Sequence, residues 1–229
     1  MHRAALLALL RRYRPIDTAD AACRTRFAAF VESQPRCFER ALAPGHVTGS
    51  AWIMDRDGAR VLLTHHRKLD IWVQPGGHAD GDPDVAAVAA REALEETGLP
   101  GLALRGEGLF DLDIHPIPAR GETPAHEHFD ARFAFQATTS ENFEVSAESH
   151  ALAWVDLNDL EKVTREPSLL RMREKWRRMP LLGEQPTGLP AETVKSPITF
   201  DPRKISEPGG AAECVKPGEP SIPTRTLLP

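Results

Sequence analysis

Three glutamates in one short segment, Glu92, Glu95 and Glu96, have the spacing of a cation-binding site. Each residue of an α-helix turns by roughly 100°, so positions i, i+3 and i+4 fall on one helix face within about one turn. Carboxylates crowded in this way repel one another, but their oxygens are also the ligands that a hard divalent cation prefers. Because acids with this spacing also occur on ordinary solvated helices, the spacing alone leaves both interpretations open.

The residues around the acids predict the helix that carries them. Asp82 is the expected N-cap, and Pro83 suits the first helical position. Arg91 is expected to hold the acids in place by pairing with Glu95 or by reaching back to Asp84. Small or apolar residues on the opposite face allow close packing on a sheet, namely Ala86, Ala90, Ala93 and Leu94.

Glycines mark both ends of this segment. Gly76 and Gly77 precede the helix directly after an apolar strand end, and Gly98 is the expected left-handed residue that stops it. Glycine has no Cβ atom, so the pair lets the backbone approach a metal ion or a ligand closely. These flanks favour a functional site over a solvated helix face.

The segment Gly77 to Leu99 resembles the signature of the Nudix hydrolases, G-x5-E-x7-R-E-U-x-E-E-x-G-U, in which U is a bulky apolar residue. The matching positions are Gly77, Arg91, Glu92, Glu95, Glu96, Gly98 and Leu99. Two positions depart: Pro83 stands where the early glutamate belongs, and Ala93 is a small version of an apolar position. The first departure affects whatever support that glutamate gives the loop, whereas the three acids are intact.

The resemblance implies a metal-dependent hydrolase. In the family, the helix acids hold Mg²⁺ or Mn²⁺, and the last glycine before the signature, here Gly76, adds its backbone carbonyl. The expected catalytic residues are Glu92, Glu95, Glu96 and Arg91, and the expected metal ligands are Gly76, Glu92, Glu95, Glu96 and Glu148. Glu148 is the candidate for an additional acid from a later loop, with an exposed loop acid as the alternative.

The predicted reaction is hydrolysis of a diphosphate linkage in a nucleoside diphosphate joined to another group. Divalent ions offset the charge that builds on the phosphate oxygens, and one of the helix acids or a later carboxylate takes the proton from water. A non-catalytic nucleotide sensor on the same fold would be expected to lack the acids. A prenyl diphosphate isomerase would need a cysteine near the sheet, but Cys23, Cys37 and Cys214 lie outside the expected domain.

Residues near the glycine pair are expected to bind the substrate: Arg67, Gln74 and His78. Arg67 belongs to a cationic run, residues 65–68, and its guanidinium can donate forked hydrogen bonds to phosphate. A solvated loop is the alternative interpretation of that run.

A second polar cluster surrounds His128. His126, Glu127, His128 and Asp130 follow one another on an expected strand, and His115 is near in sequence. Residues i and i+2 of a strand share a face, so these side chains could bind a metal ion or recognise substrate. Ordinary surface histidines are the alternative.

The periodicity of apolar residues predicts a layered α/β domain over residues 44–165. Strands are expected at 47–55, 60–65, 71–74, 109–115, 129–137 and 151–155, and a further helix at 156–162. Asp57 and Gly58 form the expected turn between the first two strands. The resemblance implies an α/β/α sandwich with a mixed sheet.

Three further parts complete the expected organisation. Helices at 1–14 and 17–33 form an N-terminal helical extension, residues 1–43. A basic amphipathic helix, within residues 166–179, is expected to pack on its own domain, with a contact to nucleic acid or a partner as the alternative. The proline-rich tail, residues 180–229, has no helical or strand period and is predicted to be disordered or draped over the surface.

Composition limits the classes of partner. The 229 residues carry a formal net charge of −5, so nucleic acid is not an expected partner. Three scattered cysteines argue against a disulfide framework and favour the cytoplasm. The apolar run at 4–10 is too short to span a membrane. The expected partner is a small nucleotide, and a homodimer is compatible with the resemblance because members of the family often dimerise.

Overall fold

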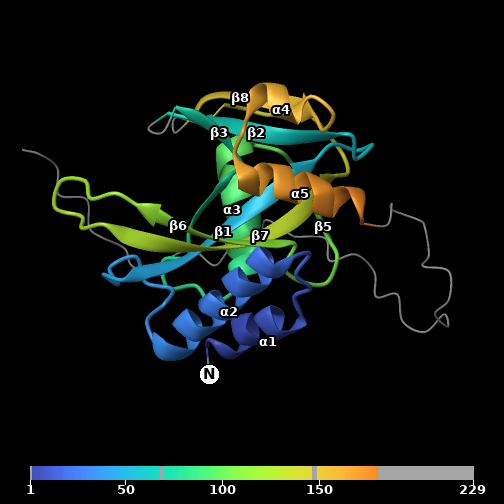
Figure 1. Ribbon diagram of the computed structural model, residues 1–229. Helices are drawn as coiled ribbons and strands as arrows, with labels where there is room; N and C mark the ends of the chain where they lie inside the picture. Colours follow the sequence, from blue (N-terminus) through green and yellow to red (C-terminus); the bar gives the residue numbers. More distant parts are fainter. Residues whose placement is uncertain (1, 68–69, 146–148, 180–229) are drawn as a thin grey trace, which may run out of the picture.

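The computed structural model describes residues 2–67, 70–145 and 149–179 (Figure 1). Its helices are α1 (Ala4–Arg12), α2 (Thr18–Ser33), α3 (Val85–Thr97), α4 (Leu160–Val163) and α5 (Pro167–Arg177). Its strands are β1 (Gly45–Met54), β2 (Arg60–His66), β3 (Ile71–Val73), β4 (Gly76–His78), β5 (Leu102–Arg105), β6 (Asp111–Ile117), β7 (His126–Ala137) and β8 (Ser149–Asp156). The predicted tail at 180–229 lies outside the described residues.

The strands form one mixed sheet with β1 and β7 at its centre. These two strands are parallel, and their register places His46 opposite His128 and Thr48 opposite Asp130. Strands β5 and β6 pair with the other edge of β7, while β4 and β2 pair with β1, all antiparallel. Strand β2 also pairs with β3 and β8, which lie together with it at the top of Figure 1. The mixed sheet that the resemblance implied is confirmed.

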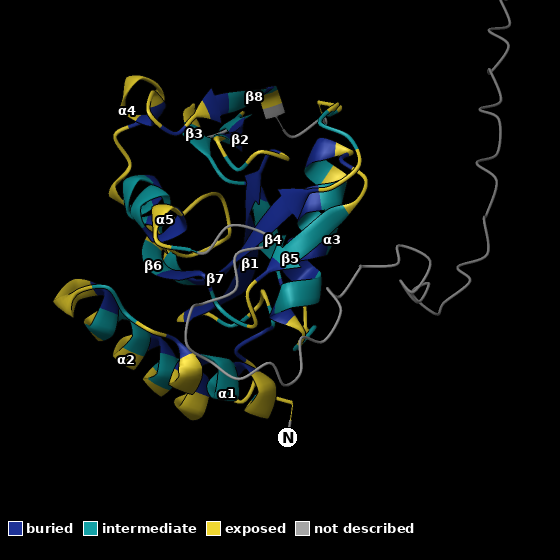
Figure 2. Cartoon of the chain, turned by 90° about the vertical axis from the view of Figure 1, so that its right-hand side faces the viewer, coloured by how far each residue is buried: buried dark blue, intermediate teal, exposed yellow. Residues whose placement is uncertain are grey.

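Helices cover both faces of this sheet, with α3 on one side of β1 and α5 on the other (Figure 2). Gly49 lets α3 approach closely, because a Cβ atom there would lie 2.8 Å from the carbonyl oxygen of Val85. On the opposite face, apolar residues of β1 cluster with those of α5, namely Trp52, Met54, Leu169, Met172 and Trp176. Helix α5 therefore packs on its own domain, and the α/β/α layers are confirmed.

The N-terminal helices share the main apolar core. Leu6, Leu10, Phe27 and Val31 are fully or almost fully buried in the cluster that also contains residues of α3 and β7. The ring of Phe30 stacks on Phe129 of β7 with a centroid distance of 3.7 Å. The division of the chain into an extension, a Nudix-like domain, a helix and a tail stays a prediction.

Several local expectations need correction. Helix α3 begins later than expected, because Asp84 caps it by accepting a hydrogen bond from the backbone N–H of Ala87. Asp82 instead accepts from the backbone N–H of Asp84, and Pro83 lies before the helix. Gly98 ends the helix in the left-handed conformation, φ 64°, as predicted.

The remaining differences concern strands. Strands β4 and β5 were not expected, because three or four residues are too few to display a period. Strand β6 starts two residues later than predicted, and β7 starts three residues earlier. Helix α4 starts only at Leu160 because the preceding residues complete β8 and a turn.

Among the described residues, no helix is both long and apolar enough to cross a membrane.

Candidate active site

The acidic face of α3 lies directly against the glycine pair of β4. The backbone N–H of Gly76 donates a hydrogen bond to Glu96 Oε1 at 2.7 Å. A Cβ atom on Gly77 would lie 2.4 Å from Glu92 Oε2, and one on Gly76 would lie 2.3 Å from the Cβ of Ser50. Any side chain at these glycines would therefore displace either an acid or the neighbouring strand.

Arg91 holds this arrangement together. Its Nη2 donates to Glu92 Oε1 at 2.8 Å and to the backbone carbonyl of His78 at 3.1 Å. Its Nε lies 3.8 Å from Glu95 Oε1, so the expected pairing with Glu95 is the looser contact. Asp84 caps the helix instead. The arginine thus links two of the acids to the end of β4.

The donor set fits a hard divalent cation. Glu92 and Glu96 are half-buried, whereas the Glu95 side chain is 61% exposed. Carboxylate oxygens and a backbone carbonyl such as that of Gly76 are the ligands that Mg²⁺ and Mn²⁺ prefer. The space beside Glu92 depends on the missing Cβ of Gly77.

The loop before β8 passes the C-terminal end of α3. The backbone N–H of Glu144 donates to the carbonyl of Thr97 at 2.8 Å. The side chain of Glu144 also lies beside Gly98, because a Cβ atom on that glycine would be 3.2 Å from the Glu144 Cβ. Glu148, the expected additional acid, follows in this loop but lies outside the described residues.

The three expected substrate contacts occupy different surroundings. Gln74 donates from Nε2 to Ser50 Oγ at 3.2 Å and to Asp130 Oδ2 at 3.3 Å. Arg67 is exposed in the loop after β2, and His78 lies beside other histidines. Their role toward a substrate stays a prediction.

The sheet face toward α5 carries a larger polar group, of which the sequence analysis identified only His115, His128 and Asp130. Its members alternate along three neighbouring strands: His46, Thr48, Ser50, Asp111, Asp113, His115, His128, Asp130 and Arg132. Asp130 is its centre and accepts from Thr48 Oγ1 at 2.9 Å, Ser50 Oγ at 2.7 Å and Arg132 Nε at 2.7 Å. Burial raises the pKa of Asp130, but the charge of Arg132 and these hydrogen bonds hold it below its usual range.

The same group anchors α5, which in turn contacts α2 and the residue that follows α1. Asp111 accepts from Arg171 at 2.8 Å and from Lys175 at 2.5 Å, both on α5. Lys175 also lies 2.8 Å from Asp20 of α2 and donates to the hydroxyl of Tyr13. Polar residues at every second position of otherwise buried strands were the sequence signal that could have revealed this face.

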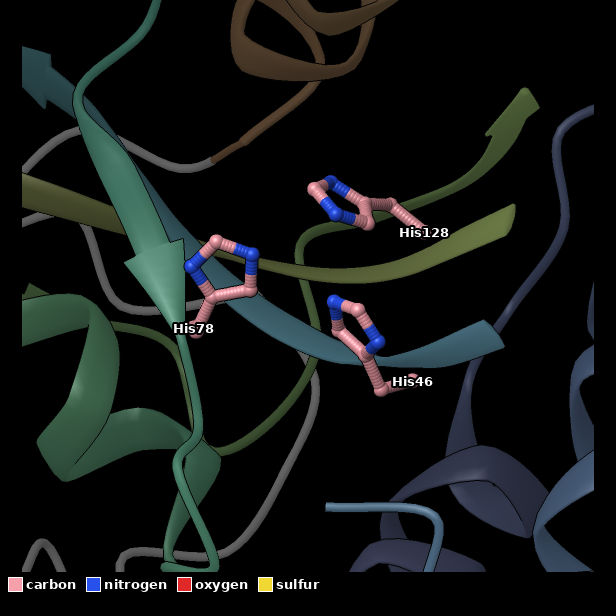
Figure 3. A group of neighbouring side chains, drawn as sticks. All are labelled: His46, His78 and His128. Carbon is pink, nitrogen blue, oxygen red and sulfur yellow. The ribbon is translucent and has the colours of Figure 1, made fainter. Parts of the chain in front are cut away.

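Histidines dominate the end of this face where β1 and β7 begin (Figure 3). The ring centroid of His46 lies 4.8 Å from that of His128 and 5.0 Å from that of His78. Burial, with neighbouring imidazoles adding to it, lowers the pKa of His46 to about 4 and that of His128 to about 3. His126 shares the face of His128, as the i, i+2 spacing predicted, with a centroid distance of 5.3 Å.

A comparison with known protein families shows to which family the chain belongs. The sequence model of the NUDIX domain matches residues 45–175, which include β1, β4, α3 and most of α5. The chain belongs to the Nudix family. The predicted class, a Nudix-type pyrophosphohydrolase, is confirmed at the level of this family.

Individual relatives of this Nudix protein are distant. The Xenopus laevis protein Nucleoside diphosphate-linked moiety X motif 6 is 37% identical over 62 residues, which are 24% of this chain and 29% of that protein. The match thus spans less than a third of that relative's length.

Two solved structures align with the chain over almost all of their own length. A Caenorhabditis elegans Ap4A hydrolase binary complex is 18% identical, with a TM-score of 0.47, and covers 57% of this chain and 94% of its own. A NUDIX family hydrolase from Clostridium perfringens is 27% identical, with a TM-score of 0.43, and covers 58% of this chain and 96% of its own. Neither likeness identifies a substrate.

Proposed function

We propose that this Nudix enzyme is a divalent-metal-dependent hydrolase that cleaves the diphosphate linkage of a nucleoside diphosphate joined to another group. The observation that most supports this activity is the packing of the Glu92 and Glu96 side chains against the glycine pair of β4. The substrate class agrees with the name of the Xenopus laevis relative, which refers to a nucleoside diphosphate-linked moiety.

Oxygen atoms of four residues would hold Mg²⁺ or Mn²⁺, with Glu148 as a fifth candidate from the loop before β8. The four are Gly76, through its backbone carbonyl, Glu92, Glu95 and Glu96. When bound, such an ion offsets the negative charge on the diphosphate oxygens during attack by water. The protein's own task is to keep the acids from splaying apart under their mutual repulsion.

Arg91 and the backbone N–H of Gly76 keep the acids in place. Arg91 carries a positive charge between Glu92 and Glu95 and also donates to the carbonyl of His78, so α3 and β4 keep their relative position. The N–H of Gly76 fixes one oxygen of Glu96. Preorganised groups of this kind avoid the cost of reorganisation when charge develops on the substrate.

A proton must leave the attacking water, and a carboxylate in contact with solvent is the residue type suited to accept it. Glu95 has the most exposed side chain of the three acids and is our candidate, beside an acid from the loop before β8. Arg67, Gln74 and His78 are proposed to contact the substrate. The proposal also includes a cytoplasmic location and, in keeping with the family, a homodimer.

A substrate panel tests the proposed function. The purified chain is incubated with nucleoside diphosphate derivatives, with Mg²⁺, with Mn²⁺ or with a chelator, and phosphate-containing products are quantified. Hydrolysis in ¹⁸O-labelled water should place the label on a phosphate product. Turnover that persists unchanged in excess chelator would rule out the metal-dependent mechanism.

A further inference from the structure

Three strands bring three histidines together at the start of β1 and β7 (Figure 3). His46 and His128 are direct neighbours in the parallel register. His78 pairs with Thr48, two residues after His46, and therefore shares their side of the sheet. One potential ligand atom of each histidine lies within 4.8 Å of those of the other two.

Ring nitrogens of His46 and His128 are buried without hydrogen bonds. Within residues 2–67, 70–145 and 149–179, four buried polar side-chain atoms lack a hydrogen-bond partner, and three of the four belong to His46 and His128. They are both ring nitrogens of His46, which is 2% exposed, and Nε2 of His128. Buried polar atoms almost always have a hydrogen-bond partner, so three unpartnered ring nitrogens in one place are a feature of a ligand-binding site.

We propose that His46, His78 and His128 bind one divalent transition-metal ion of the Zn²⁺ class. Neutral imidazole suits Zn²⁺ and its neighbours in the transition series, whereas Mg²⁺ requires oxygen ligands. Three histidines with a further position for water or a fourth ligand are a regular Zn²⁺ coordination set. This site is separate from the acids of α3 and does not depend on the proposed hydrolase activity.

The geometry requires only a small contraction. When three atoms lie within 4.8 Å of one another, some point lies within about 2.8 Å of all of them, and a Zn–N bond measures about 2.1 Å. Each nitrogen must therefore move by at most about 0.7 Å, a distance that modest rotation of the side chains provides.

Two more histidines border the proposed site. The His126 ring lies 4.9 Å from that of His46, and its Nδ1 is 2.9 Å from the carbonyl oxygen of Pro124. If Nδ1 carries the proton and donates to that carbonyl, Nε2 remains as a metal ligand, which is how outer partners commonly orient metal-binding histidines. The His115 ring lies 5.4 Å from that of His128. His126 is accordingly our candidate for the fourth ligand.

Titration of the full-length, metal-free protein with Zn²⁺ by calorimetry and with Co²⁺ by visible absorption tests the proposal. We expect one ion per chain. His46→Gln and His128→Gln should each weaken binding by about 100-fold or more, while exposed His150→Gln is the matched control. Glu96→Gln should retain the ion, which separates this site from the acids of α3.

Each of these measurements has a result that would overturn the proposed histidine site. Unchanged Zn²⁺ binding in both histidine variants, or loss of the ion in Glu96→Gln, would overturn the proposal, as would the absence of stoichiometric binding in the parent protein. X-ray absorption of the Zn²⁺-loaded parent protein needs no variant and guards against misfolding. At least three imidazole ligands are expected, and a shell of oxygen or sulfur ligands contradicts the site.

Discussion

The acidic site on α3 and the histidine group at the start of β1 and β7 offer ligands of opposite character. The first collects carboxylates on one helix turn, with Glu95 open to solvent. The second collects imidazoles from three strands, with His46 almost fully buried. Hard oxygen donors suit Mg²⁺ or Mn²⁺, and imidazoles suit ions of the Zn²⁺ class. The two proposed sites would therefore select different metals by ligand chemistry.

The two sites share one structural link. His78 follows Gly77 directly, and its backbone carbonyl accepts a hydrogen bond from the arginine that pairs with Glu92. An ion bound to His78 would thus fix the end of β4 on which the acids rest.

The largest effect is expected from Glu96→Gln. The substitution keeps the size of the side chain but removes the charge that the N–H of Gly76 orients, so kcat should fall about 10³-fold. Steady-state hydrolysis in saturating Mg²⁺ measures it. Glu161→Gln, at an exposed position on α4, is the control and should retain activity. A loss of less than about threefold in Glu96→Gln would remove this residue from the mechanism.

Gly77→Ala should come next. The added Cβ would lie 2.4 Å from the carboxylate of Glu92. We therefore expect activity to fall about 10- to 100-fold and the Mg²⁺ concentration needed for half-maximal activity to rise. Gly108→Ala is the matched control, because its Cβ would have only an ordinary contact, 3.7 Å to Leu9. Equal activity of both variants would show that the acid does not need this space.

Thermal unfolding should distinguish the metals. Zn²⁺ at ten times its dissociation constant stabilises a protein by about 1.4 kcal/mol, which is a rise in Tm of about 3–6 °C for a chain of this size. The rise should persist in Glu96→Gln and vanish in His128→Gln. If Mg²⁺ produces the same rise through His128, the division by ligand chemistry is wrong.

An effect of similar size is expected at Asp20, which supports the histidine face through Lys175. Burial raises the pKa of Asp20, but hydrogen bonds from Lys175 and Tyr13 outweigh it and hold that pKa below its usual value. A depressed carboxyl pKa stabilises the fold above about pH 4, and this contribution is lost as the pH falls through the folded-state value. Asp20→Asn should therefore cost about 1–2 kcal/mol at pH 7 and less at pH 3.

Urea unfolding at both pH values measures this difference. Asp57→Asn, at an exposed turn position, should follow the parent protein at each pH. A cost for Asp20→Asn that is the same at pH 3 as at pH 7 would show that the buried carboxylate does not carry the pH dependence.

The sequence by itself determined the acidic helix, its glycine flanks and the family, because these features depend on residues that are close together in the sequence. Helical spacing fixes which acids share a face, and Gly98 ends the helix for a reason that is local to its own backbone. Short-range rules of this kind need no knowledge of the fold.

Only the tertiary structure decided the histidine group and the polar face. His46 and His128 are 82 residues apart and meet through a parallel register that no local pattern specifies. Asp111, Asp130 and Lys175 likewise find their partners across strands and helices. Strand β4 also depends on its pairing with β1 and its packing against α3. Its three residues are too few to show a strand period or a strand propensity in the sequence. Long-range pairing depends on how the whole chain closes, and the local sequence does not encode it.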